Sequence, residues 1–176
     1  MACSNPKDME AFLEASKLKL NHAKISAFCS TRKKELKADE DPNLKAVIDS
    51  KAAAAAVFGK TWILHIERQL NASKQENLDA IYDSIKFLKD NSIEVFFDAE
   101  HFFDGFKDDR EYALECLRQA IAAGASCIVL CDTNGGCLPD EIPGIVNEVR
   151  AAFPNVQLGI HCHNDSGCAV ANTLIA

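Results

Sequence analysis

The stretch Gly159-Ile160-His161-Cys162-His163-Asn164-Asp165-Ser166-Gly167 decides how the rest of the chain is interpreted. Two histidines stand two residues apart, and residues 156–160 before them form a short, mostly apolar run typical of a strand. If the strand stays extended, its period of two places both imidazoles on one face. We therefore expect this pair at the carboxyl end of a strand, where parallel α/β proteins place their chemistry.

The pair His161 and His163 has two interpretations. Neutral imidazole is the commonest metal ligand among protein side chains, so the pair is a candidate metal site. Alternatively, both rings could form hydrogen bonds with nearby backbone groups. The spacing is short and common, and by itself it leaves both interpretations open.

Length and composition indicate one globular domain. The chain has 176 residues, of which 48% are hydrophobic and 26% are charged. Its net charge of −7 argues against nucleic acid or an anionic membrane as a partner. No apolar run is long enough to span a bilayer, and residues 1–10 are too polar for a signal peptide.

The eight cysteines are numerous, but none of them forms a C-x-x-C pair. A zinc knuckle or a thioredoxin motif is therefore not indicated. Several cysteines lie in apolar runs, as in residues 127–131. We expect reduced thiols that act as small core residues in a cytoplasmic protein.

Apolar runs alternate with segments of helical periodicity along the whole chain. The strands are expected at residues 24–29, 52–58, 93–97, 127–131 and 156–160. The helices are expected at residues 6–20, from 42, 74–89, 109–123, 139–153 and after 167. Five successive alanines, 52–56, favour a helix by propensity, but the alternation demands a strand there. Residues 60–66 are interpreted as a loop forming a pocket wall, and Asp104-Gly105 as a turn.

Polar side chains gather just after three of the expected strands. The clusters are Asp98/Glu100/His101, Asp132/Thr133/Asn134 and His161/His163/Asn164. Three clusters on one rim favour a (β/α) barrel over a doubly wound sheet, and no glycine-rich phosphate loop is present. A full barrel needs about 250 residues. The predicted fold is therefore α/β, a partial (β/α)8 TIM barrel of about five parallel strands with outer helices.

The interior of such a barrel is filled by side chains from alternate strand positions. The residues expected to point inward, themselves or through their strand neighbours, are Ile25, Phe28, Val57, Val95 and Val129. An open arc leaves two strand edges and this inner surface exposed, so we expect the isolated chain to be marginally stable.

These residues resemble a known family, the pyruvate-carboxylate-transferase barrels. It includes isopropylmalate, homocitrate and citramalate synthases, together with the hydroxymethylglutaryl-CoA lyases. The run 159–165, followed by Ala169-Val170-Ala171-Asn172, carries the resemblance. Residues 4–8, 58–62, 98–105 and 131–136 are most similar to citramalate synthases within the family.

The resemblance implies condensation of acetyl-CoA with a 2-keto acid, here pyruvate, to give citramalate and free CoA. It implies a divalent metal, one of Mn, Zn, Mg or Co, with His161 and His163 as two of the ligands. Glu100 would be the catalytic carboxylate, and Thr133 would bind the carboxylate of the keto acid. The parent enzyme is expected to be a cytoplasmic homodimer.

For the remaining polar residues the sequence suggests supporting roles. Asp132 and Asn134 are expected to brace a turn, whereas Asn164 and Asp165 are expected to orient the histidine loop and cap the next helix. His101 is interpreted either as a neighbour of the site or as a surface residue. His22 and His65 are predicted to be structural.

The sequence also departs from the family. The first-strand motif Asp-Thr-Thr-Leu-Arg-Asp-Gly, which supplies a carboxylate ligand and an arginine, is not present. Residues 1–176 are therefore expected to be a central fragment of the catalytic barrel, lacking the first two strands, the last strand and a C-terminal regulatory domain. Such a fragment is expected to be inactive alone.

Three interpretations remain open at this point. The chain is a fragment of a citramalate synthase, or of another family member such as an isopropylmalate synthase or a lyase, or it is a metal-binding module without catalysis.

Overall fold

The computed structural model describes residues 5–176. The strands are β1 (Ser26–Ser30), β2 (Ala54–Lys60), β3 (Glu94–Glu100), β4 (Cys127–Asp132) and β5 (Leu158–Cys162). The helices are α1 (Pro6–Ala15), α2 (Pro42–Asp49), α3 (Ile63–Arg68), α4 (Lys74–Asp90), α5 (Phe102–Asp108), α6 (Arg110–Ala122), α7 (Ile142–Ala152) and α8 (Ala169–Ile175). The predicted alternation of strand and helix is confirmed, including the strand that follows the alanine run.

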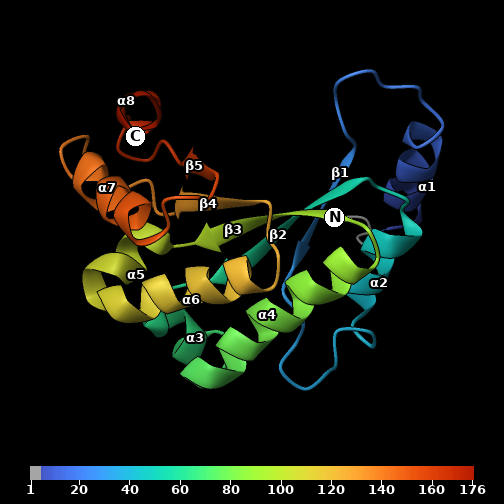
Figure 1. Cartoon of the computed structure of the whole chain (residues 1–176), viewed down its shortest axis with the longest axis horizontal. Helices are drawn as coiled ribbons and strands as arrows, with labels where there is room; N and C mark the ends of the chain where they lie inside the picture. Colours follow the sequence, from blue (N-terminus) through green and yellow to red (C-terminus); the bar gives the residue numbers. More distant parts are fainter. Residues whose placement is uncertain (1–4) are drawn as a thin grey trace.

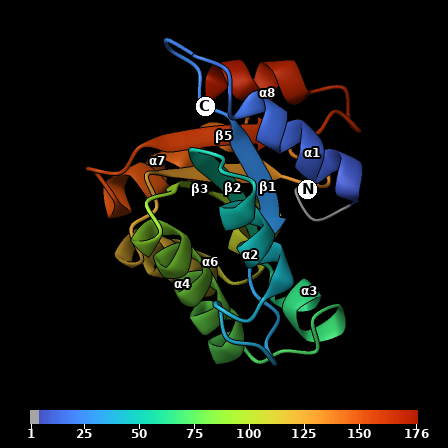
Figure 2. The ribbon, with the colours of Figure 1, turned by 90° about the vertical axis from the view of Figure 1, so that its right-hand side faces the viewer.

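The five strands form one parallel sheet whose order follows the sequence, β1-β2-β3-β4-β5. Helices α4 and α6 pack side by side against one face, and α1 and α8 stand at the two ends of the sheet (Figures 1 and 2). A parallel sheet built in sequence order, with helices outside, is an arc of a (β/α) barrel. The predicted partial barrel is therefore confirmed.

Alternation along the strands separates two faces. On β3 the residues Val95, Phe97 and Ala99 are fully buried against the helices, while Phe96 and Asp98 between them are partly exposed on the other face. Each large apolar side chain buried in this way stabilises the fold by about 1.5–3 kcal/mol. The core therefore lies between sheet and helices, and the second face of the strands lines the inside of the arc.

The helix starts that place these layers are specified locally. The side chain of Asn5 accepts a hydrogen bond from the Asp8 amide at 3.0 Å and caps α1, with Pro6 at its first position. Asp41 caps α2, and Ser73 and Glu76 form a capping box on α4. Such caps satisfy amides that a helix leaves without partners. The first predicted helix is shorter than expected and ends at Ala15, as α1's bounds show.

Two short helices occupy segments that the sequence predicted as loop and turn. The predicted loop 60–66 contains the start of α3, and the predicted turn at Asp104-Gly105 lies inside α5. Both helices are too short to show a helical period. α5 fits closely against the residue that follows β2, because a Cβ on Gly105 would lie 2.2 Å from the carbonyl oxygen of Thr61. Close backbone contact, rather than a turn, explains this glycine.

Of the five residues predicted to point inward, themselves or through their strand neighbours, two do so themselves and two through their neighbours. Phe28 lies on the inner face, stacked on Phe58 at 5.1 Å between ring centroids, and Val129 lies on that face opposite Asp98. Val57 and Val95 instead face the helices and are completely buried. Their neighbours take the inner positions. Ile25 precedes β1.

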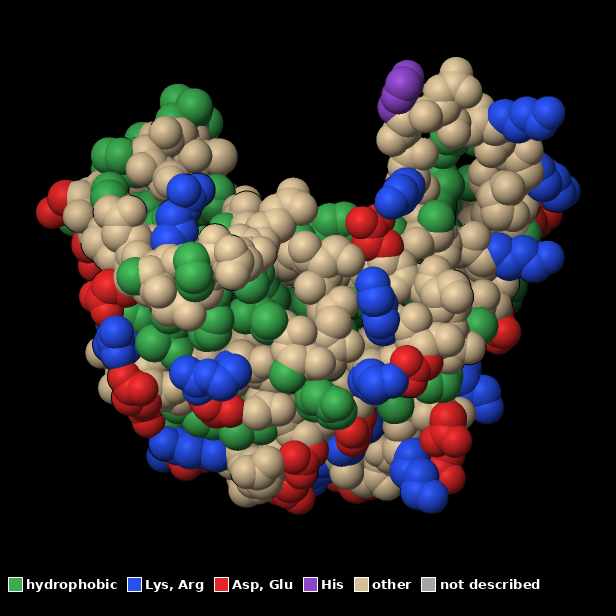
Figure 3. All heavy atoms as spheres, viewed as in Figure 1, with side chains coloured by type: hydrophobic (Ala, Val, Ile, Leu, Met, Phe, Trp, Pro, Cys, Tyr) green, Lys and Arg blue, Asp and Glu red, His purple; other side chains and the backbone are tan. Residues whose placement is uncertain are grey.

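The inner face of the sheet opens to solvent. Figure 3 shows a broad hollow in the surface between the side that carries α8 and the side that carries α1. Within residues 5–176, no helix combines the length and the apolar character needed to cross a bilayer. None of the cysteines in that range forms a disulfide, as predicted.

Candidate active site in the hollow of the sheet

A cavity of about 190 Å³ lies where the carboxyl ends of the strands meet on the inner face. Its lining residues are Phe28, Phe58, Asp98, Glu100, Cys131, Thr133, His161 and His163. All four residues predicted for the site, Glu100, Thr133, His161 and His163, are therefore brought together, although they come from three different strands or strand ends. Their roles remain predictions.

The register of the sheet produces this convergence. Glu100 is paired with Lys60 on β2, and Cys131 is paired with His161 on β5. Because residues opposite each other in a sheet share a face, these side chains point into the same space. Asp98 lies two residues before Glu100, so it points to the same side but deeper.

Glu100 is held by two contacts from β2 and the residue that follows it. Its Oε2 lies 2.7 Å from Nζ of Lys60, and the two side chains are only 23% and 15% exposed. Its backbone carbonyl accepts hydrogen bonds from the amide and the hydroxyl of Thr61, at 3.1 and 2.9 Å. The carboxylate is thus fixed at the rim of the cavity next to a cation.

Thr133 is oriented by an unusual backbone conformation. His101 adopts φ 59° and ψ 33°, in the left-handed region that non-glycine residues rarely occupy. In this conformation its amide donates a hydrogen bond to Oγ1 of Thr133 at 2.8 Å. The hydroxyl proton of Thr133 is left available for an acceptor in the cavity. His101 is 6% exposed, so it is a buried neighbour of the site and not a surface residue.

Asp132 braces the turn after β4, as predicted. Its side chain is 1% exposed and accepts hydrogen bonds from the amides of Gly136 and Cys137, both at 3.2 Å. Its carbonyl accepts the amide of His163 at 3.1 Å, which couples the turn to the histidine loop. Asn134 also supports this region, donating to Asp104 at 2.9 Å.

The two histidines of the opening motif lie side by side in the hollow. Their ring centroids are 5.0 Å apart, and both residues are exposed to the open cavity. Asn164 accepts a hydrogen bond from the amide of Ala169 at 3.1 Å and so supports the start of α8, as predicted. The backbone of the second histidine is held by the hydrogen bond of its amide to Asp132.

Asp98 and Cys131 were missed as site residues by the sequence interpretation. One ligand atom from each, together with one from His161, all lie within 4.8 Å of one another. Burial raises the pKa of Asp98, with His161 acting in the opposite direction, and burial raises the pKa of the Cys131 thiol. The signal was the alternation: Asp98 shares its face with Glu100, and Cys131 is two residues before Thr133.

His65, which the sequence analysis predicted to be structural, lies close to the site. It lies on α3 with its ring 4.1 Å from that of His101 and 4.8 Å from that of Trp62, centroid to centroid. Burial lowers the pKa of His65, and electrostatic interaction with His101 and Lys60 lowers it further. A structural role fits these contacts, and the residue lies near the ion pair of Lys60 and Glu100. His22 is exposed between α1 and β1.

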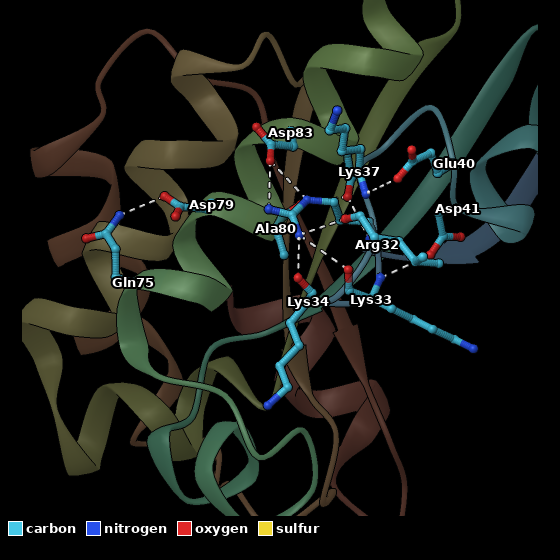
Figure 4. Close-up of polar contacts among 12 residues, drawn as sticks. Arg32, Lys33, Lys34, Lys37, Glu40, Asp41, Gln75, Asp79, Ala80 and Asp83 are labelled. Carbon is cyan, nitrogen blue, oxygen red and sulfur yellow. Dashed lines mark hydrogen bonds and ion pairs between the residues drawn. The ribbon is translucent and has the colours of Figure 1, made fainter.

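A second cavity, of about 250 Å³, adjoins the first along Phe58 and is covered by the basic loop after β1. Arg32 fixes this loop, because its guanidinium binds Asp83 of α4 at 2.7 and 2.9 Å (Figure 4). The guanidinium also donates a hydrogen bond to the carbonyl of Leu36. The loop is further held by the Lys33 amide, which donates to Asp41. Lys33 and Lys34 thus line this second cavity, although the protein as a whole is acidic.

Comparison with curated proteins gives a consistent set of relatives. The chain is 51% identical to the (R)-citramalate synthase of Geobacter sulfurreducens and 51% identical to that of Sulfolobus acidocaldarius, in each case over 98% of this chain and 33% of the relative. It is 34% identical to the 2-isopropylmalate synthase of Methanocaldococcus jannaschii over 76% of this chain and 25% of that protein. The chain thus spans about a third of the length of the curated relatives it matches.

Comparison with solved structures supports the fold. A hydroxymethylglutaryl-CoA lyase from Pseudomonas aeruginosa superposes with a TM-score of 0.78 at 19% identity, over 97% of this chain and 54% of that one. The lyase from Bacillus subtilis gives a TM-score of 0.76 at 18% identity, over 94% of this chain and 54% of the lyase. The HMGL-like family matches residues 1–176, the whole of the sequence. With its barrel arc, its histidine loop and this match, the chain belongs to the HMGL-like family.

Proposed function

We propose that this chain forms part of the catalytic barrel of a citramalate synthase, which condenses acetyl-CoA with pyruvate to give citramalate and CoA. The single observation that carries the proposal is the cavity that Glu100, Thr133, His161 and His163 line together. The similarity to (R)-citramalate synthases over 98% of the chain supports the choice of reaction.

The donor atoms in the cavity suit a divalent cation. Two imidazoles lie side by side, and both are exposed to the open cavity. His161 and His163 would hold the ion, and the keto acid's own oxygens would fill further positions. When bound, a divalent ion supplies Lewis-acid polarisation of the keto carbonyl. Imidazole nitrogens together with the oxygens of the keto acid suit zinc, manganese, magnesium or cobalt to different degrees.

The protein groups would then divide the remaining work. The carboxylate of Glu100 would accept a proton from the methyl group of acetyl-CoA, and the resulting carbon nucleophile would form a bond to C2 of the keto acid. The π bond of the keto carbonyl opens as this bond forms, and the alkoxide takes up a proton from solvent. The hydroxyl of Thr133 donates a hydrogen bond to the keto acid's carboxylate and orients it. Water then hydrolyses the thioester and releases CoA as a thiol.

The aromatic floor of the cavity supports a small keto acid. Phe28 and Phe58 stack below the polar groups and would place an apolar surface against the methyl group of pyruvate. The basic side chains of Lys33 and Lys34 at the neighbouring cavity would favour the phosphates of acetyl-CoA. Both substrates are anions, so cations at this rim assist binding.

The test is an assay of thiol release with the complete protein, comparing pyruvate, 2-oxoisovalerate and 2-oxoglutarate at equal concentrations. We expect kcat/KM to be highest for pyruvate. A preference for 2-oxoisovalerate would replace the proposal with an isopropylmalate synthase, the activity of the more distant relatives. No thiol release with any keto acid would favour a non-catalytic binding module.

A further inference from the structure

Three side chains of different chemistry converge in the deeper part of the cavity. Asp98, Cys131 and His161 come from the adjacent strands β3, β4 and β5, and one ligand atom from each lies within 4.8 Å of the other two. Cys131 is opposite His161, and Asp98 is opposite Val129, two residues earlier on β4. Because strands rather than loops carry all three, their spacing is fixed by the sheet.

Such a set of oxygen, sulfur and nitrogen donors is close to what a tetrahedral zinc ion requires. Zinc bonds of about 2.0–2.3 Å place the ligand atoms roughly 3.3–3.8 Å apart, so side-chain shifts of about 1 Å would close the site. His161 faces the open cavity, which leaves a fourth position for water. A thiolate selects soft ions such as zinc and cadmium over magnesium and manganese, which prefer oxygen.

We propose that Asp98, Cys131 and His161 form a binding site for a thiophilic divalent cation, distinct from the His161 and His163 pair, and that its occupation inhibits the enzyme. On binding, the Cys131 thiol releases its proton to solvent as the sulfur–metal bond forms. The inhibition follows because the ion occupies His161, and the inhibition rests on the proposed function. The binding site itself does not.

The direct test titrates cadmium into the complete protein and follows the ultraviolet charge-transfer band of the thiolate–cadmium bond. Cys131→Ser should weaken the corresponding binding step at least about tenfold. Cys162→Ser is the matched control. Cys162 follows His161 on the same strand, but its thiol forms a hydrogen bond with the side chain of Thr173 on α8. That control should bind cadmium as the unmodified protein does.

A second variant guards against loss of the fold in the first. Asp98→Asn keeps the thiol and the volume but removes the anionic oxygen, so it should also weaken the cadmium step while retaining the band. Circular dichroism verifies that each variant is folded. Equal cadmium affinity in the unmodified protein, Cys131→Ser and Asp98→Asn would overturn the site.

The inhibition is measured separately, as the fraction of each variant's own activity that zinc removes at saturating manganese. The unmodified protein and Cys162→Ser should be inhibited, and Cys131→Ser should need at least about tenfold more zinc. If cadmium binding depends on Cys131 but the protein shows no thiol-release activity, the cation site is retained and the proposed function is rejected. Thiol release with equal zinc sensitivity in all variants would reject the inhibition and keep the function.

Discussion

The ammonium nitrogen of Lys60 lies 2.7 Å from Oε2 of Glu100, across neighbouring strands at the mouth of the cavity. Each side chain is less than a quarter exposed, so the charges interact with little screening by water. This pair joins the residue proposed to accept the substrate proton to a cation that the sequence motif did not mark as functional.

Replacing Lys60 with Met is expected to lower the free energy of unfolding by roughly 1–3 kcal/mol, since it leaves a half-buried carboxylate without its partner. Lys24→Met is the matched control, because Lys24 pairs with Glu94 at 2.6 Å on an exposed surface. That change should cost roughly 0–1 kcal/mol. Urea unfolding of both variants measures the difference, and equal losses would show that the Lys60 pair is energetically a surface pair.

Glu100→Gln should leave the fold and substrate binding intact while lowering kcat by roughly 10²-fold or more, because the amide cannot accept a proton. The substitution preserves volume, so a loss confined to kcat separates chemistry from binding. Steady-state thiol release gives both parameters. An unchanged kcat would exclude Glu100 as the proton acceptor.

His161→Ala and His163→Ala should each reduce metal binding and abolish turnover in the complete protein, since losing one ligand sharply weakens a metal site. His22→Ala is the control, because His22 is exposed outside the cavity. Metal content and activity are measured on the same samples. Retention of both in either cavity variant would make that histidine structural.

Gly105→Ala tests the close contact between α5 and the residue that follows β2. The added methyl group would meet the carbonyl of Thr61, which is backbone and cannot move aside, so we expect a loss of about 2–4 kcal/mol. Gly144→Ala on α7 meets nothing within 4 Å and should stabilise the protein by about 0.4–1 kcal/mol. Thermal melts compare the two, and similar shifts in Tm would contradict the contact.

His65 should make the stability depend on pH. Its pKa in the folded protein lies below the usual 6.5, mainly through burial, with His101 and Lys60 lowering it and Glu100 and Asp104 raising it. Between that lowered pKa and 6.5 the unfolded chain binds more protons, so stability falls as pH drops through this window. His65→Gln should flatten the slope. Urea unfolding at several pH values from about 5 to about 7.5 decides it, and an identical slope would refute the assignment.

The order of strands and helices could be predicted because each element carries its own signal. The strand 127–131 is a continuous apolar run, and Asn5, Asp41 and Ser73 mark helix starts. The family motif then located Glu100, Thr133 and the histidines. Short helices such as α3 and α5 give no periodicity, and their formation depends on contacts with residues distant in sequence.

For a related reason, the sequence could not decide between Val57 or Val95 and their strand neighbours as the inward-facing residues. Val57 on β2 has two apolar neighbours along the strand, and Val95 on β3 has one. Hydrophobicity alone therefore does not reveal which face of the sheet each valine takes. The polar Asp98 and Glu100 fix the phase of β3, because a charged side chain belongs on the solvent side of the sheet. Extending that phase across the register would have identified Asp98 and Cys131 as well.

The division of each strand into a helix-facing half and a cavity-facing half has a consequence for evolution. Along β3, substitutions at Val95, Phe97 and Ala99 alter packing, whereas those at Phe96 and Asp98 alter only what the hollow can hold. A deep mutational scan should therefore show tolerance that alternates residue by residue. Lineages can change substrate by drifting at every second position while the scaffold stays under purifying selection.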